Sequence, residues 1–138
     1  EAVGNWAERR GLSYTSYTDL ASKSDVYELV GKDIERVNGS LAQDEKLKES
    51  QITRFLILHK ELDPDDNELT RTRKVRRRFI ADKYSDLVEA LYSSADSVDI
   101  DAQVTFEDGR TGSIQATLAI RDVALQAVGE SRVDVRAA

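Results

Sequence analysis

Two stretches of the chain repeat apolar residues at spacings of three and four, which is typical of helices that bury one face. The first stripe consists of Val26, Leu29, Val30, Ile34, Val37 and Leu41. We expect Ser24 to cap this helix and Asn38-Gly39 to end it. The second stripe consists of Phe79, Ile80, Tyr84, Leu87, Val88, Leu91 and Tyr92. Thr72 is its expected N-cap, which would place the preceding basic residues in its first turns.

The downstream part alternates apolar and polar residues on both sides of Asp108-Gly109, a pattern that predicts a β-hairpin. The alternating residues are Val98, Ile100, Ala102, Val104 and Phe106, then Ile114, Ala116, Leu118 and Ile120. A two-residue loop would mix apolar and polar residues on both faces. A three-residue loop, Glu107-Asp108-Gly109 with Gly109 left-handed, would pair Ile100 with Ala116 and Val98 with Leu118. We favour the longer loop because it makes one face apolar.

Shorter elements complete an α+β fold of two main amphipathic helices, a central strand and the C-terminal hairpin. The central strand is expected over Gln51–His59, with Phe55, Ile57 and Leu58 as its apolar residues. A helical turn is expected near Trp6, and Thr18 or Asp19 would cap a short helix at Leu20–Lys23. The expected organisation is a main segment (1–97), the hairpin (98–121) and a weakly patterned tail (122–138) that is frayed at its end.

The composition is that of a small domain with a modest core, because 33% of the 138 residues are charged and 40% are apolar. The chain has no cysteine, which excludes disulfides and thiolate metal sites. We find no signal peptide and no apolar run approaching the length of a membrane span. The only histidine, His59, has no Ser, Cys or second His in a catalytic or metal-binding pattern, so we expect it to be structural or solvated.

Charge is strongly segregated in this chain, whose net charge is −6. Six of the eight residues from Arg71 to Arg78 are Arg or Lys, whereas Glu61–Glu68 holds five carboxylates and the only proline. Cations near a helix N-terminus oppose the macrodipole, at about 0.3–1 kcal/mol each when exposed. We infer that the segment holds its cations for an anion. The acidic turn is a poor calcium loop, because Glu68 stands where such a loop needs glycine.

The basic segment resembles a motif of the long-chain acyl-CoA synthetases, members of the adenylate-forming AMP-binding superfamily. The motif, Glu-Leu-Thr-x-Thr-x-Lys-x-Arg-Arg, corresponds to Glu68–Arg77. The resemblance covers residues 4–92 and includes Gly4–Glu8, Tyr14–Leu20, Val37-Asn38, Phe55–Glu61 and Tyr84–Tyr92. It implies that the chain is the small C-terminal accessory domain of a long-chain fatty acid–CoA ligase.

The resemblance also implies a catalytic role for Lys74, because a lysine of this domain reaches the substrate carboxylate and the ATP α-phosphate during adenylation. A compact ammonium on a flexible stem suits that task. Many adenylating enzymes have glycine directly before this lysine, where this chain has Arg73. Arg73, Arg76 and Arg77 are weaker candidates for phosphate contacts of ATP or CoA. Whether Lys74 lies on a loop or in the first helical turn is open at this stage.

Part of the enzyme that the resemblance implies is absent from this sequence. The chain has neither a phosphate-binding Gly-x-x-x-x-Gly-Lys-[Ser/Thr] motif nor a glycine cluster. We therefore expect a fragment that is inactive alone and has the N-terminal adenylating domain as its partner. The full-length enzyme would use ATP, CoA, Mg²⁺ and a fatty acid, and no metal site is expected here. Its expected location is cytoplasmic, with peripheral contact to the inner face of the membrane left open.

Two other classes of function remain open on the sequence. The chain could be a docking module that binds a partner, or a second copy of itself, through the apolar face of the hairpin. Residues 71–78 could instead follow a nucleic-acid backbone, with Phe79 or Tyr84 stacking on bases. The acidic balance of the chain, with a pI near 4.9, disfavours that reading. We therefore expect no nucleic-acid partner.

Overall fold

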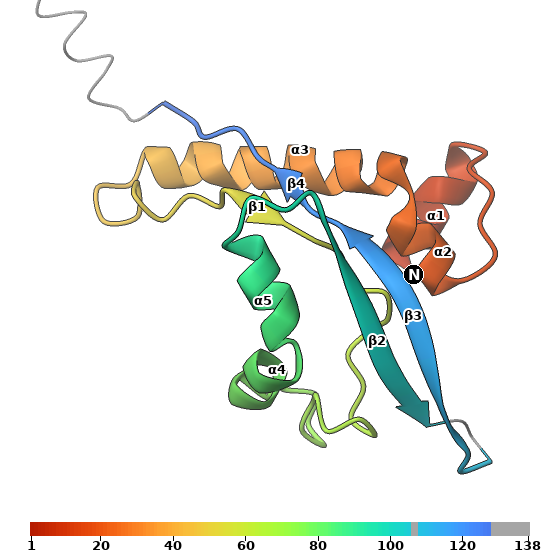
Figure 1. Cartoon of the computed structure of the whole chain (residues 1–138). Coiled ribbons are helices and arrows are strands. Elements are labelled where there is room, and N and C mark those ends of the chain that lie inside the picture. Colours follow the sequence, from red (N-terminus) through yellow and green to blue (C-terminus); the bar gives the residue numbers. More distant parts are fainter. Residues whose placement is uncertain (106–107, 128–138) are drawn as a thin grey trace, which may run out of the picture. The chain divides into compact units, whose positions relative to one another are not determined.

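The computed structural model describes residues 1–105 and 108–127 and has an α+β fold (Figure 1). The chain is divided into two compact units. The first combines Glu1–Ser22 with Leu56–Ile120, and the second combines Lys23–Phe55 with the segment that begins at Arg121. The helices are α1 (Ala2–Arg9), α2 (Tyr17–Ser22), α3 (Ser24–Ala42), α4 (Arg77–Lys83) and α5 (Ser85–Leu91). The strands are β1 (Arg54–Phe55), β2 (Ser97–Thr105), β3 (Thr111–Ala119) and β4 (Arg121–Asp122).

The hairpin of β2 and β3 in the first unit confirms the predicted register. Val98 lies opposite Leu118 and Ile100 opposite Ala116, as a three-residue loop requires. Gly109 has φ 83°, a left-handed conformation that glycine adopts without steric cost. Phe106 and Glu107, which the prediction also included, lie outside the described residues. The apolar pattern therefore selected the correct pairing of the two strands.

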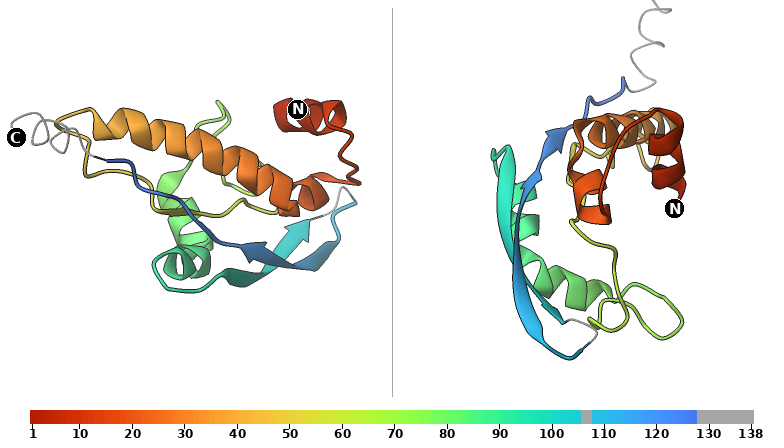
Figure 2. Two further views of the ribbon diagram at one scale, coloured as in Figure 1. Left: turned by 90° about the horizontal axis from the view of Figure 1, so that it is seen from above. Right: turned by 90° about the vertical axis from the view of Figure 1, so that its right-hand side faces the viewer.

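Helices α4 and α5 pack on one face of this hairpin (Figures 1 and 2). The buried residues of this core are Tyr84 and Leu87 from the helical segment and Leu118 from β3. Partly buried apolar residues surround them: Leu56, Leu58, Leu62, Ile80, Val98, Ile100 and Ala116. The apolar face of the hairpin is thus covered by helices of the same unit.

The predicted second helix is wrong in its start and in its continuity. It begins at Arg77 with Arg76 as N-cap, so Thr72 does not cap it and Lys74 lies before it. Tyr84 interrupts the helix with φ −107° and ψ 28°, which divides it into α4 and α5. Because of this break the predicted stripe is not a single buried face, and Tyr92 is 90% exposed.

The second unit contains the predicted first helix, which is longer than expected. It continues past Asn38-Gly39 to Ala42, and Lys23 rather than Ser24 is its N-cap. The fully buried Asn38 does not end the helix because its side chain bonds the backbone of Ile52, with Nδ2 to O at 2.8 Å and N to Oδ1 at 2.7 Å. Tyr27 on the same helix stacks on Phe55 of β1 at 5.6 Å between ring centroids.

The predicted central strand over residues 51–59 is reduced to the two residues of β1. Arg54 pairs with Asp122 and Phe55 with Arg121 of β4, so the residues where the predicted hairpin meets the predicted tail form a strand. The Arg54 side chain also binds the Asp122 carboxylate at 2.8 Å. Residues 128–138 of that tail lie outside the described residues. A strand needs a neighbour for its hydrogen bonds, and within residues 51–59 the strand pairing is formed by Arg54 and Phe55.

The N-terminal helices also differ from the prediction. Helix α1 covers Ala2–Arg9, and α2 begins at Tyr17 rather than Leu20. The hydroxyl of Ser16 accepts the N–H of Asp19, whose carboxylate accepts the N–H of Thr15. This reciprocal arrangement resembles a capping box, so neither Thr18 nor Asp19 is the cap. Within the described part of the chain, no helix has the length and apolar character of a membrane span.

Candidate active-site loop around Lys74

The motif residues 69–75 form a tight hairpin-like loop that precedes α4. Leu69 and Val75 pair as an antiparallel bridge at its base. Above them the N–H of Thr70 donates to the carbonyl of Lys74 at 2.8 Å, and the N–H of Arg73 donates to the carbonyl of Thr70 at 2.8 Å. These bonds close the loop on itself. They place Lys74 on the loop rather than in the first helical turn.

The backbone of Lys74 is held, but its ammonium is not. Its N–H donates to the hydroxyl of Thr70 at 3.0 Å, and that hydroxyl lies 3.1 Å from the hydroxyl of Thr72. The side chain of Lys74 is exposed, and it has no ion pair or hydrogen bond to any residue of the described ranges 1–105 and 108–127. Thr70 therefore shapes the loop, while the lysine charge is available to an outside anion.

Arg73 adopts a backbone conformation that is costly for its residue type. Its φ is 64°, in the left-handed region that glycine enters most readily. Glycine, which the resemblance to adenylating enzymes leads one to expect directly before the lysine, adopts this conformation without steric cost. The local geometry gives that preference a physical reason, because the turn needs a left-handed residue at this position. Arginine satisfies the geometry at some conformational cost.

The three candidate arginines have different surroundings. Arg76 is engaged within the protein, since its Nη1 donates to the carbonyl of Asn67 at 2.9 Å and its guanidinium lies 5.1 Å from the centre of the Phe79 ring. Arg73 is exposed on the loop, and Arg77 is exposed at the first position of α4. Arg73 and Arg77 are thus accessible to a ligand near Lys74, whereas the side chain of Arg76 contacts Asn67 and Phe79.

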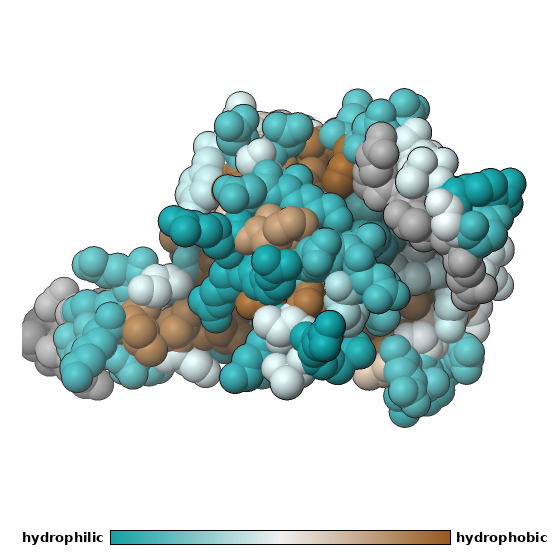
Figure 3. Space-filling view, turned by 90° about the horizontal axis from the view of Figure 1, so that it is seen from below, coloured by the Kyte–Doolittle hydropathy of each residue, from teal (hydrophilic) through white to brown (hydrophobic). Residues whose placement is uncertain are grey.

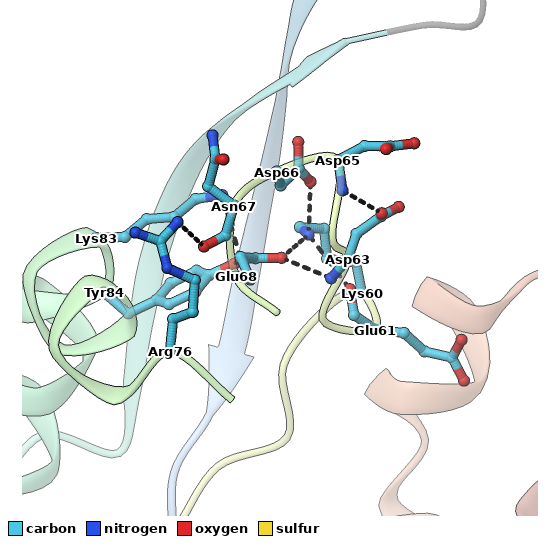
Figure 4. A network of polar contacts seen from close by, with 10 residues as sticks. All are labelled: Lys60, Glu61, Asp63, Asp65, Asp66, Asn67, Glu68, Arg76, Lys83 and Tyr84. Carbon is cyan, nitrogen blue, oxygen red and sulfur yellow. Dashed lines mark hydrogen bonds and ion pairs between the residues drawn. The ribbon is translucent and has the colours of Figure 1, made fainter. Parts of the chain in front are cut away.

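Glu68, the first residue of the motif, is the centre of a buried polar network (Figure 4). Its side chain is fully buried. One carboxylate oxygen accepts Lys60 Nζ and, at 3.1 Å, the N–H of Asp63. The other accepts the hydroxyl of Tyr84 and forms an ion pair with Lys83 Nζ at 3.2 Å. Each carboxylate oxygen therefore has two donors, as a buried anion requires.

The network strongly favours the ionised form of Glu68. Burial alone raises the pKa of its carboxyl, but the hydrogen bonds from Lys60, Tyr84, Asp63 and Lys83 outweigh that effect and lower the pKa to about 2. Burial and the bond to Glu68 raise the pKa of Tyr84, so the phenol stays a donor. Lys60 loses some proton affinity through burial, yet its bonds to Asp66 and Glu68 raise its pKa.

His59 lies beside this network and is also buried. Its side chain is 2% exposed, and neither ring nitrogen has a hydrogen-bond partner among the residues that the structure describes. Burial lowers its pKa, and the neighbouring charge of Lys60 lowers it further. A neutral, enclosed imidazole fits the structural role expected from the sequence, and the solvated alternative is wrong.

The acidic turn upstream serves the fold of the first unit. Asp66 binds Lys60 Nζ at 2.8 Å, and the carboxylate of Asp63 accepts the N–H of Asp65 at 2.9 Å (Figure 4). Within the described ranges, no group of three or more His, Asp or Glu side chains is arranged to hold a metal ion.

Sequence reasoning missed the central role of Glu68. The sequence predicts Glu68 only as one of five carboxylates of an acidic turn, and it predicts Tyr84 on the apolar face of a helix. A usable signal was its position at the start of the motif, next to an apolar residue and before several cations. Its partners Lys60 and Lys83 lie too far along the chain for any local pattern to reveal them.

Comparisons with known proteins give relatives that are named as fatty-acid–CoA ligases. A fatty-acid–CoA ligase of Mycobacterium tuberculosis (fadD11) is 35% identical over 94 residues, which is 68% of this chain and 15% of that protein. A long-chain fatty-acid–CoA ligase of the same species (FadD15) is 29% identical over 94 residues, covering 67% of this chain and 15% of that protein. A Bos taurus long-chain fatty-acid–CoA ligase (ACSBG1) is 27% identical over 99 residues, covering 70% and 13%.

These relatives support the resemblance at the level of the family name. The chain spans about 15% of the length of the first curated relatives that it matches. No family model matches the chain. No solved structure matches it either. The chain is thus similar to a small part of proteins named as fatty-acid–CoA ligases.

Proposed function

We propose that this chain supplies the adenylation lysine, Lys74, to an ATP-dependent long-chain fatty acid–CoA ligase. The chain would be the C-terminal accessory domain and would share the active site with an N-terminal adenylating domain of the same polypeptide. The observation that carries the proposal is the state of Lys74. Its backbone is held by Thr70, while its ammonium is exposed and unpaired within the described part of the chain.

The proposed reaction has two steps. An oxygen of the fatty carboxylate attacks the α-phosphorus of ATP, the bond to the pyrophosphate oxygen breaks, and an acyl adenylate forms. The thiol sulfur of CoA then attacks the acyl carbon, its proton is lost to solvent, and AMP leaves. Lys74 would act in the first step, where its ammonium stabilises the negative charge that develops at the α-phosphate. Arg73 and Arg77 are exposed cations suited to further phosphate contacts.

The test uses the full-length ligase with Lys74→Ala and measures the two steps separately. Acid-dependent pyrophosphate release should fall about 10²–10³-fold, because a charge that stabilises the transition state is lost. Thioester formation from supplied acyl adenylate should stay near the unmodified rate. Lys46→Ala is a matched control, since Lys46 is also exposed and lies outside the motif. If the rate of pyrophosphate release is unchanged in Lys74→Ala, the proposal is wrong. The result would then favour a docking module or a nucleic-acid-binding segment.

A further inference from the structure

We propose that Glu68 is the positioning residue for Lys74: its buried carboxylate anchors the base of the loop that presents the Lys74 ammonium. This inference rests on the proposed function of Lys74 and deepens it. It assigns a purpose to a buried charge that the adenylation chemistry does not itself use.

The anchor is a carboxylate that cannot move without breaking several bonds. Glu68 is fully buried, and its two oxygens take donors from two separate parts of the first unit. Lys60 and Asp63 lie before the motif, whereas Lys83 and Tyr84 lie at the end of α4 and the break that follows it. Figure 4 shows these groups converging on Glu68. The side chain therefore ties the start of the motif to the segments on both of its sides.

The connection to Lys74 runs through successive backbone pairs. The carbonyl of Glu68 accepts the N–H of Arg76 at 3.0 Å, which closes the base of the loop. The Leu69–Val75 bridge follows, and the bond from Thr70 N to Lys74 O at 2.8 Å comes next. Thr70 also accepts the N–H of Lys74 with its hydroxyl. A shift of Glu68 would thus change the pairing that orients the backbone of Lys74.

Left-handed backbone conformations at both ends of the segment support the same reading. Asn67, directly before Glu68, has φ 62°, and Arg73, directly before Lys74, has φ 64°. Asparagine enters this region readily, whereas arginine stays there only where surrounding contacts fix it. Within the loop, the N–H of Arg73 donates to the carbonyl of Thr70 at 2.8 Å, and beside Glu68 the side chain of Arg76 binds the carbonyl of Asn67 at 2.9 Å.

The decisive experiment is a double-mutant cycle between Glu68→Gln and Lys74→Ala in the full-length ligase. Glu68→Gln keeps the size of the side chain but removes its charge. With Lys74 present, we expect the kcat of pyrophosphate release to fall about 10- to 100-fold, because small misplacements of a catalytic group have effects of this size. With Lys74→Ala already in place, Glu68→Gln should change that rate by less than about twofold, because nothing remains to be positioned.

The controls separate positioning from loss of the fold. Thioester formation from supplied acyl adenylate should stay within about twofold of the unmodified enzyme in Glu68→Gln. Glu61→Gln, which changes an exposed carboxylate of the same turn, should leave both steps unchanged. If Glu68→Gln does not fold, Tyr84→Phe removes one donor while leaving the carboxylate in place, and it should show the same dependence on Lys74 at smaller amplitude. Equal losses in both Lys74 backgrounds, or none, would overturn the inference.

A readout without catalysis distinguishes failure of this inference from failure of the proposed function. Amide hydrogen exchange of the chain reports on the Lys74 N–H, which Thr70 accepts. We expect its exchange to be about tenfold faster in Glu68→Gln than in the unmodified chain, while amides of α3 stay unchanged. Unchanged exchange at Lys74 overturns the anchoring even if Lys74→Ala abolishes adenylation. Faster exchange with full adenylation in Lys74→Ala supports the anchoring and rejects the proposed function.

Discussion

The two ends of the Glu68–Lys74 segment use charge in opposite ways. Glu68 is fully buried and surrounded by donors, whereas Lys74 is exposed and has no ion pair within the described part of the chain. A buried charge without partners would be very costly, so Glu68 is held by several bonds at once. An exposed cation carries no such cost and stays available to a ligand. One short motif thus contains both a buried carboxylate with several donors and an exposed cation with no ion pair in the described part of the chain.

Outside this segment, the surface has no comparably distinct candidate site among the residues that the structure describes. Apolar side chains on the face drawn in Figure 3 lie as separate patches among hydrophilic ones. Exposed apolar residues such as Tyr92 and Leu125 belong to different units. The predicted self-association through the hairpin stays a prediction, although α4 and α5 cover the hairpin face on which it was based.

Removing the Glu68 carboxylate is expected to have the largest effect on the stability of the chain. Glu68→Ala should lower the free energy of unfolding by about 3 kcal/mol, because Lys60 and Lys83 would lose their common anion in a largely buried site. Lys74→Ala should change it by less than about 0.5 kcal/mol, as expected of an exposed residue with few contacts. Urea denaturation of the two variants checks this difference. Similar losses of unfolding free energy in the two variants would show that Glu68 and Lys74 do not differ in their contribution to stability.

Acidification should weaken the anchor in a predictable pH range. The pKa of Glu68 is about 2 in the folded protein and near 4.5 in the unfolded chain, so the folded state binds fewer protons. The stability from this group is therefore complete above about pH 4.5 and is lost as the pH falls towards 2, by on the order of 3 kcal/mol. Urea midpoints measured across this range should fall more steeply for the unmodified chain than for Glu68→Gln. Parallel curves would contradict the prediction.

Tyr84→Phe removes one of the four donors to the Glu68 carboxylate and leaves the other three in place. The variant loses the hydroxyl that binds Glu68 but keeps the ring in the core. We expect a loss of about 1–2 kcal/mol, since the buried carboxylate keeps its bonds to Lys60, Asp63 and Lys83. Thermal unfolding with circular dichroism measures this loss. Tyr92→Phe is the matched control and should have no measurable effect, because Tyr92 is 90% exposed.

The smallest expected effect concerns the conformation of the loop. Arg73→Gly should stabilise the chain or leave it unchanged, within about 1 kcal/mol, because relief of left-handed strain opposes the greater freedom of glycine when unfolded. Arg73→Val should destabilise it by about 1–2 kcal/mol, because a β-branched residue tolerates positive φ poorly. Urea midpoints of the two variants should therefore differ in this order. The reverse order would show that φ at this position is not what restrains the loop.

Local patterns were reliable where neighbouring residues decide the structure. The stripe that begins at Val26 predicted α3, and alternation together with Asp108-Gly109 predicted the strand pairing, including Val98 opposite Leu118. They were unreliable at boundaries. Asn38-Gly39 resembles a helix end, but the tertiary bonds of Asn38 to Ile52 let the helix continue. Thr72 resembles an N-cap, but it lies in the loop of residues 69–75, and α4 begins only at Arg77.

The candidate site was predicted in part. The motif located Lys74 and the neighbouring arginines from sequence alone, and it left open whether the lysine lies on a loop or in a helix. The structure decided for the loop, and it separated Arg76, which binds Asn67, from the accessible Arg73 and Arg77. Neither periodicity nor charge pattern indicated the role of Glu68, because its donors come from segments on both sides of the motif.

The sequence by itself determined the α+β class, the long helix, the register of the hairpin and the position of the lysine motif. These features depend on spacing, turn residues and side-chain type, all of which act between near neighbours. Only the tertiary structure decided the burial of Glu68, the break at Tyr84 and the pairing of β1 with β4. A buried carboxylate is stable only when donors from distant segments converge on it, and a local pattern carries no information about which segments those are.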